Sequence, residues 1–243
     1  MSTIAEKLTT IAENEQKVYD KGADNGKRKY WKCFTVNGTR TDYKYAFMNT
    51  DFSGETIPSD LFRPTESSSS AFQYYQGKTL PLGLDFSGVP IGQSMSSATA
   101  YRLFYYAESL EEVYDIKLPN QRAYQSMFEN CTSLKKVEKF VAYSIATFGN
   151  TFKNCNSLVD IIFDGVIGRS INFQYSPLNI ASMKNIISCL ADYSTDNTGT
   201  NTIAFTDTCW ETLEASGKPY DDGLTEDATL TWKNYVISLG WNV

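Results

Sequence analysis

Apolar and polar positions along this chain repeat at a fixed interval, because the step from Phe104 to Phe128 equals the step from Phe128 to Phe152. Each of the three segments begins with Phe, has Leu six positions later and ends with Val or Ile three positions beyond the Leu. The segments are Phe104–Val113, Phe128–Val137 and Phe152–Ile161. A fixed period of this length is typical of folds whose units bury their apolar faces by stacking on their neighbours. The pattern therefore predicts one buried column of phenylalanines and a second of leucines.

Weaker copies extend the repeat in both directions. Phe47 and Phe72 are separated by almost the same interval, and Phe173 follows Phe152 after a slightly shorter one. The step from Phe72 to Phe104 is clearly longer, which indicates an insertion. Ser- and Gly-rich stretches on both sides of Phe72 are typical of loops. We expect the repeats to cover most of residues 43–178.

The motif Phe-x-Asn-Cys-x-Ser-Leu-x-x-Val/Ile occurs at 128–137 and 152–161, and the segment 104–113 matches it without the Asn-Cys pair. This motif closely resembles the BspA-like, or Treponema pallidum-type, leucine-rich repeat. The resemblance implies an α/β fold: a leucine-rich-repeat solenoid with an N-terminal helix and a helix–strand region that caps the C-terminal end. Repeat arrays of this kind present extended surfaces for binding, so the implied function is recognition.

The segments that flank the repeats are similar to a narrower group. Residues 2–27, 37–47 and 176–187 resemble small repeat proteins encoded in phage and prophage structural gene clusters of gut Firmicutes. The resemblance implies a phage tail or baseplate structural protein that displays a leucine-rich-repeat domain for host-surface binding. The implied partners are other virion proteins and a host cell-surface glycan or protein. The implied location is the virion, assembled in the host cytoplasm.

Two alternatives stay open at this stage. The chain could be a purely structural or decoration protein of the virion, or a bacterial surface adhesin, because BspA-like repeats occur in both settings. Residues 1–7 are polar and lack the apolar centre of a secretion signal, which favours the phage interpretation. No apolar run approaches the roughly 20 residues of a membrane span, so we expect no membrane contact.

Residues 1–28 predict a helix that serves in oligomerisation or in docking to the virion. Ser2 or Thr3 can cap it, and its apolar positions keep a heptad register. These positions are Ile4, Leu8, Ile11 and Val18. Leu at a heptad a position with Ile at d favours three or four strands, which indicates a homotrimer. The alternative is a lone helix that packs on the repeats or on another virion protein.

The remaining chain divides into residues 29–178, expected to form an N-terminal cap and the repeat array, and residues 179–243, expected to form a C-terminal capping region. Helical spacing of apolar residues predicts a helix over 179–191. Asp207 is the expected cap of a second helix, and a third is expected between 225 and 239. A short strand is predicted at 202–205.

Composition narrows the function classes. The chain has 243 residues, a net charge of −6 and no His, which excludes His-based catalysis and disfavours nucleic acid as a partner. Its five cysteines form no Cys-x-x-Cys pair and are expected to be reduced, buried thiols. We therefore expect no enzyme, no cofactor and no metal site. The weak alternative is a hydrolytic carboxylate pair built from Glu111 or Glu112 with Asp164.

Tyrosine is abundant, with 16 residues, and it is a favoured contact residue at interfaces. The candidate ligand-binding residues are Tyr75, Tyr105, Tyr106 and Tyr124. Stacked in neighbouring repeats, they would form an amphipathic strip suited to sugars or peptides. The alternative is that these tyrosines fill the core or the cap.

Overall fold

The structure is a computed structural model, and it describes residues 47–54, 70–82, 84, 86, 100–114, 116, 118, 123–195 and 200–243. The expected N-terminal helix lies outside these residues, together with its heptad positions Ile4, Leu8, Ile11 and Val18. The four candidate tyrosines and the three clearest repeats lie within them.

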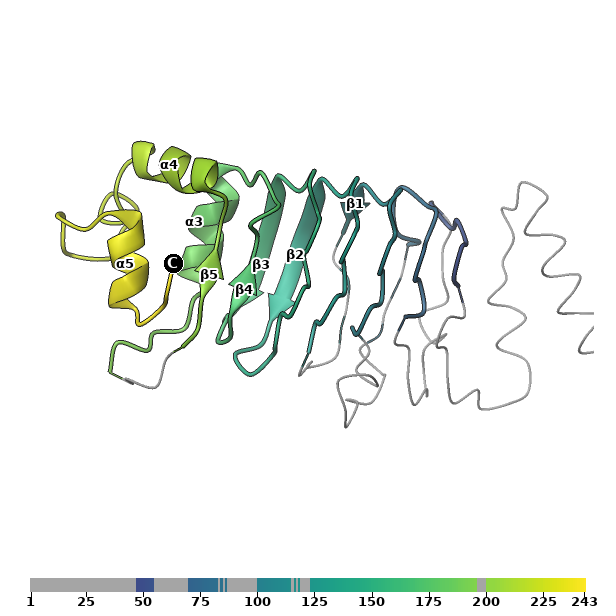
Figure 1. Cartoon of the computed structure of the whole chain (residues 1–243), viewed down its shortest axis with the longest axis horizontal. Coiled ribbons are helices and arrows are strands. Elements are labelled where there is room, and N and C mark those ends of the chain that lie inside the picture. Colours follow the sequence, from purple (N-terminus) through teal and green to yellow (C-terminus); the bar gives the residue numbers. More distant parts are fainter. Residues whose placement is uncertain are drawn as a thin grey trace, which may run out of the picture.

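The centre of the molecule is a row of turns that lie side by side, each built around one Phe (Figure 1). Backbone N–H groups of one turn donate to carbonyl oxygens of the next turn along the row. Phe72 N donates to Leu103 O at 3.0 Å, and Phe104 N donates to Met127 O at 2.9 Å. Because these polar groups are satisfied only in one alignment, the hydrogen bonds fix the register in which the turns stack.

The phenylalanines form one continuous buried column. The ring centroids of Phe104 and Phe128 lie 5.5 Å apart with an interplanar angle of 5°, and those of Phe128 and Phe152 lie 5.9 Å apart. The same column also contains Phe47, Phe72, Phe173 and Phe205. The predicted phenylalanine column is thus confirmed, and it includes the weaker copies of the repeat on both sides.

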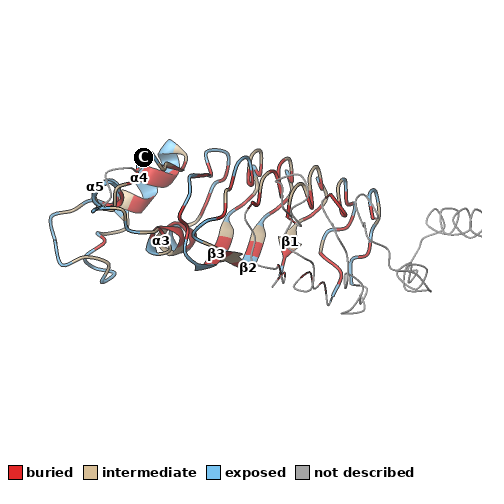
Figure 2. Cartoon of the chain, turned by 90° about the horizontal axis from the view of Figure 1, so that it is seen from below, coloured by how far each residue is buried: buried red, intermediate tan, exposed pale blue. Residues whose placement is uncertain are grey.

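Two further columns run beside the phenylalanines. The predicted leucine column is buried, and it consists of Leu110, Leu134 and Leu158. The second column contains free thiols: Cys131 Sγ donates to Phe104 O and Cys155 Sγ donates to Phe128 O, both at 3.1 Å. Buried residues line the inside of the stack, and exposed residues lie toward its outer edges (Figure 2).

Short parallel strands continue from some of the turns. A three-stranded sheet consists of β1 (Glu112–Val113), β2 (Lys136–Ala142) and β3 (Asp160–Gly165), in that order. A two-stranded sheet consists of β4 (Ile171–Asn172) and β5 (Ile203–Ala204). In the first sheet, paired residues are one repeat apart, because Val113 pairs with Val137 and Val137 pairs with Ile161. The register of β2 and β3 shifts after Val137, so that Phe140 pairs with Phe163.

The helices of the described chain follow the stacked turns at their C-terminal side (Figure 1). They are α3 (Ile180–Ser188), α4 (Asp207–Ala215) and α5 (Trp232–Ser238). Each begins after an N-cap side chain that accepts a hydrogen bond from the first turn: Asn179, Thr206 and Thr231. The second helix therefore begins one residue earlier than predicted, with Thr206 as its cap and Asp207 inside it. The third is shorter than the span expected for it.

Helix α3 covers the free edge of strand β3. Ile161 N donates to Ser182 Oγ at 2.9 Å, and Phe163 N donates to Asn185 Oδ1 at 2.7 Å. Asn185 Nδ2 returns a hydrogen bond to Phe163 O at 3.2 Å. Side chains of the helix thus satisfy the backbone groups that a fourth strand would otherwise pair with, and they end the sheet.

The prediction of a leucine-rich-repeat solenoid is wrong. In the part of the chain that the structure describes, there are small parallel sheets of three and two strands and three helices. Segment 70–82 contributes isolated bridges, such as that between Thr79 and Glu112, in place of a strand. The physical reason is that the regular spacing of the repeat determines which side chains stack but does not determine the backbone conformation between them. Tight turns hold the stack together, and the strands beside them stay short.

Replacing Phe128 by Ala should lower the free energy of unfolding by roughly 3–5 kcal/mol, because it opens a cavity between two stacked rings. Chemical denaturation of the full chain measures the loss. Replacing the exposed Tyr175 by Ala is the matched control and should change stability by less than about 0.5 kcal/mol. Equal effects of the two substitutions would contradict the buried column.

Replacing Asn185 by Ala should destabilise the fold by about 1–3 kcal/mol, because the N–H and the carbonyl of Phe163 both lose their partner. Replacing Ser188 by Ala, on the exposed side of the same helix, should have little effect. Hydrogen exchange at Phe163 provides a local measurement. An exchange rate at Phe163 that Asn185→Ala leaves unchanged would show that α3 does not protect this edge.

Candidate binding surface

Two of the four candidate tyrosines lie in the core. Tyr75 and Tyr124 have no exposed surface. The Tyr75 hydroxyl donates to Thr79 O at 2.9 Å and accepts from Phe52 N at 3.0 Å, while the Tyr124 hydroxyl donates to Val141 O at 2.7 Å. Burial raises the pKa of Tyr75 to about 12 and raises that of Tyr124 as well. For these two residues, ligand contact is ruled out, and the alternative of core filling holds.

The other two candidates are half-buried, and they lie beside a third tyrosine on the surface. The rings of Tyr105 and Tyr106 meet edge to face with centroids 4.6 Å apart. The ring of Tyr106 lies 5.5 Å from that of Tyr74, which is 38% exposed and belongs to the preceding turn. No described residue makes a hydrogen bond to the hydroxyl of any of the three. Within the described chain these three hydroxyls thus differ from those of Tyr75 and Tyr124, which are hydrogen-bonded.

Arg102 completes this cluster from the same turn as Tyr105 and Tyr106. Its guanidinium carbon lies 4.8 Å from the centroid of the Tyr105 ring and 5.2 Å from that of the Tyr101 ring. Within the described residues it has no carboxylate partner, and its Nε makes no hydrogen bond. We call Tyr74, Tyr105, Tyr106 and Arg102 the tyrosine surface. The aromatic rings hold its cation in place, and no described carboxylate neutralises the charge.

The backbone under two of these tyrosines is strained. Tyr74 has φ of 56° and Tyr106 has φ of 58°, a left-handed conformation that is unfavourable for a bulky side chain. The residue two positions after the Phe has positive φ in other turns too, where it is Asn49, Asn130 and Asn154. Asn tolerates this conformation better than Tyr does. Strain at surface residues that add little to the core is a reason to look for a function there.

Polar side chains continue the tyrosine surface along the next two turns. Glu129, only 8% exposed, follows Tyr105 in its row and pairs with Lys153 at 3.6 Å. Asn154 Nδ2 donates to Asn130 Oδ1 at 2.7 Å in the row that contains Tyr106. Burial and then the charge of Glu129 raise the pKa of Tyr105, so its hydroxyl stays protonated and can donate.

Tyr74 and Arg102 lie on this surface but are not among the residues predicted from the sequence. The signal that distinguishes Tyr74 from Tyr75 is the alignment of the turns on their Phe. In that alignment Tyr74 shares a column with Tyr106 and Asn130, whereas Tyr75 shares one with the small Cys131 and Cys155. A large residue in the column of buried thiols has to lie in the core.

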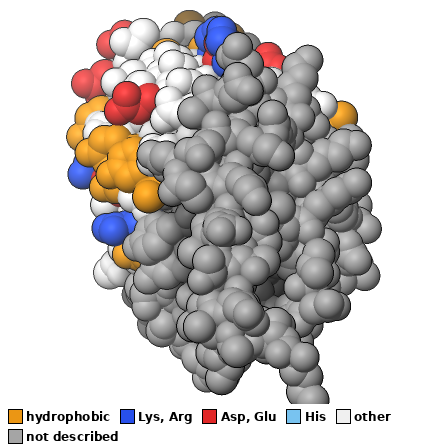
Figure 3. Space-filling model, turned by 90° about the vertical axis from the view of Figure 1, so that its right-hand side faces the viewer, with side chains coloured by type: hydrophobic (Ala, Val, Ile, Leu, Met, Phe, Trp, Pro, Cys, Tyr) orange, Lys and Arg blue, Asp and Glu red, His pale blue; other side chains and the backbone are white. Residues whose placement is uncertain are grey.

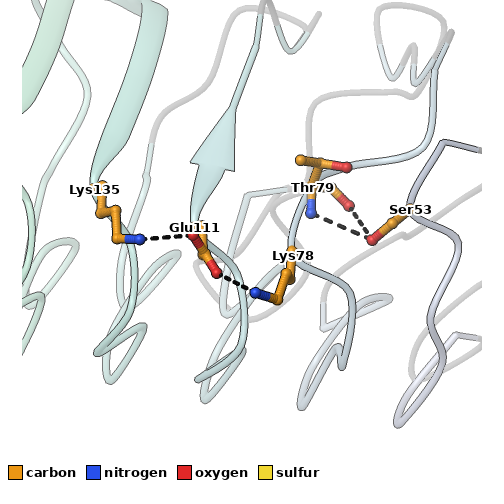
Figure 4. Close-up of polar contacts among 5 residues, drawn as sticks. All are labelled: Ser53, Lys78, Thr79, Glu111 and Lys135. Atoms are coloured by element: carbon orange, nitrogen blue, oxygen red, sulfur yellow. Dashed lines mark hydrogen bonds and ion pairs between the residues drawn. The ribbon is translucent and has the colours of Figure 1, made fainter.

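A row of charges joins three neighbouring turns (Figure 4). Glu111 accepts from Lys78 Nζ at 2.8 Å and from Lys135 Nζ at 2.7 Å. The hydrogen bond from Lys135, followed in size by that from Lys78, lowers the pKa of Glu111 to about 2. Ser53 Oγ similarly contacts the backbone of Thr79. Glu111 thus serves as a charged link between turns, which argues against the weak alternative of a hydrolytic acid at this position.

Other surface features are less specific. Hydrophobic side chains gather in one patch, with acidic and basic groups nearby, on the described part of the face in Figure 3. No described helix is long and apolar enough to cross a membrane. Across the residues that the structure describes, no group of three or more His, Cys, Asp or Glu side chains could hold a metal ion. The tyrosine surface is therefore the arrangement on which we base a function.

No protein-family model, no curated protein and no solved structure matches this chain.

Replacing Glu111 by Gln should make the stability of the chain less dependent on pH. The folded pKa of about 2 lies below the unfolded value of 4.5, so the carboxylate stabilises the fold above pH 4.5 and loses this contribution as the pH falls toward 2. At pH 7 the melting temperature of the wild type should be higher than that of Glu111→Gln. This difference should shrink as the pH falls from 4.5 to 2. A difference that does not change between pH 7 and pH 2 would contradict the charged link.

Proposed function

We propose that this chain is a binding component of a phage tail or baseplate and that the tyrosine surface contacts the host cell surface. The observation that carries the proposal is the pair of the exposed Tyr74 and the half-buried Tyr106, both held at positive φ where other turns use Asn. Asn at both positions would serve the turns at lower strain. A ligand that needs aromatic rings at this place gives a reason for the tyrosines.

The chemistry of the surface supports binding. Tyr and Arg are enriched at the energetic centres of interfaces, because a rigid ring or a planar guanidinium gives a large contact area at a small entropic cost. Tyr105 and Tyr106 are fixed by their ring contact, and Arg102 is fixed against Tyr105. The groups are therefore ordered before a ligand arrives, which lowers the cost of binding.

The phage setting of the proposal comes from the sequence. The flanking residues 2–27 and 176–187 resemble small repeat proteins of phage and prophage structural gene clusters. In this proposal residues 1–28 dock the chain to other virion proteins, either as a homotrimer or as a single helix.

A triple variant with Tyr74→Asn, Tyr105→Gln and Tyr106→Asn should lose binding to bacterial cell envelopes. Each new residue occurs at the equivalent place in another turn, as Asn130, Gln73 and Asn130 respectively, so the fold should be retained. Pull-down of the purified chain with envelopes from a panel of gut Firmicutes measures binding. We expect at least a tenfold loss, as for central aromatic residues of an interface.

Tyr220→Asn is the matched control, because Tyr220 is 50% exposed and lies between α4 and α5. It should bind like the wild type. A folded triple variant that still binds at full strength would exclude the tyrosine surface. A wild-type chain that binds none of the envelopes would favour a purely structural virion protein.

A further inference from the structure

We infer that the ligand of the tyrosine surface is an uncharged oligosaccharide. The inference rests on the proposed function and names the chemistry of its ligand. A sugar ring offers apolar C–H groups on its faces and hydroxyl groups around its edge. The surface supplies a matching mixture of aromatic rings, hydroxyls, amides and one guanidinium.

The first argument is that the backbone of this surface is already occupied. Tyr74 N donates to Tyr105 O at 2.8 Å, Tyr106 N to Glu129 O at 2.9 Å and Asn130 N to Lys153 O at 2.9 Å. An extended peptide that binds by strand addition needs free backbone donors and acceptors at an edge. These turns have given theirs to the stack, so recognition depends on side chains.

The second argument is the supply of hydrogen-bonding groups in fixed positions. The hydroxyls of Tyr74, Tyr105 and Tyr106 have no partner among the described residues, and the hydrogen bond from Asn154 to Asn130 leaves the Nδ2 group of Asn130 free to donate. Arg102 adds further N–H donors. These donors and acceptors lie within three neighbouring turns, which suits a ligand with several hydroxyls.

The third argument is the balance of charge. A polyanion would need several uncompensated cations, and the described part of this region offers Arg102 and Lys153. Lys153 is paired with the nearly buried carboxylate of Glu129 at 3.6 Å. The net charge of the chain is −6, which opposes the approach of an acidic polymer. An uncharged sugar avoids this repulsion and still uses Arg102 as a hydrogen-bond donor.

The test divides the cell envelopes that bind the wild-type chain into three portions: untreated, treated with protease and treated with mild periodate. Periodate cleaves the bond between two carbons that carry adjacent hydroxyls, so it destroys sugar rings. We expect periodate to abolish binding. Binding that survives periodate overturns the oligosaccharide inference and leaves the proposed function standing, and loss on protease alone assigns the ligand to a protein. A wild-type chain that binds no untreated envelope overturns both.

A second measurement separates an uncharged sugar from an acidic polymer. Arg102→Ser places the residue of the equivalent Ser70 and Ser126 in this turn, and it should weaken binding about tenfold. Arg169→Ser removes the same charge from an exposed position outside the surface and should leave affinity unchanged. Affinity should also vary little between about 0.05 M and about 0.5 M salt. Equal losses in both variants together with a steep salt dependence would assign the ligand to an acidic polymer and overturn the inference.

Discussion

The hydrogen bonds between neighbouring turns are the constraint on which the rest of this structure depends. In the turns of Phe72, Phe104 and Phe128, the Phe and the residues two places before and after it donate N–H groups to the next turn, as Ser126, Phe128 and Asn130 do. The two outer donors have positive φ, 55° at Ser126 and 65° at Asn130. The phenylalanines are brought into contact because the backbones that carry them are tied in this register. The apolar column and the backbone strain thus have one origin.

The same constraint explains which small polar residues lie inside the stack. Three places after the Phe, the side chain donates to a carbonyl oxygen: Thr50 to Phe47, Cys155 to Phe128 and Ser176 to Cys155. A hydroxyl or thiol in this column satisfies a buried oxygen at little cost in volume. Where the strands end, Ser182 and Asn185 of α3 do the same for the edge of β3. Side chains therefore complete the backbone hydrogen bonding both within the turns and at the edge of β3.

The sequence was informative about contacts and less so about the backbone. The columns that contain Phe128 and Leu134 could be predicted from the sequence, because equal spacing places equivalent residues over one another. The helix at 180–188 follows from its period of apolar residues, and its cap at Asn179 lies at the predicted boundary. The backbone path of the turns did not follow from the sequence, because positive φ at Ser126 or Asn130 depends on contacts with the next turn. Tyr75 differs from Tyr74 in sharing the column of Cys131 and Cys155, so this part of the site could be predicted from the sequence.

The tyrosine surface is the place where local preference and the stacked architecture disagree. Asn130 and Asn154 show how this column is filled at low strain, with an amide hydrogen bond of 2.7 Å between neighbouring turns. Tyr74 and Tyr106 occupy the same backbone position without that hydrogen bond, and they gain a ring contact with centroids 5.5 Å apart. One such contact contributes about 0.5–1.5 kcal/mol, whereas a left-handed backbone costs roughly 1–2 kcal/mol at each of the two tyrosines. Stability therefore does not favour tyrosine over asparagine here, and the proposed binding role gives a reason for the aromatic pair.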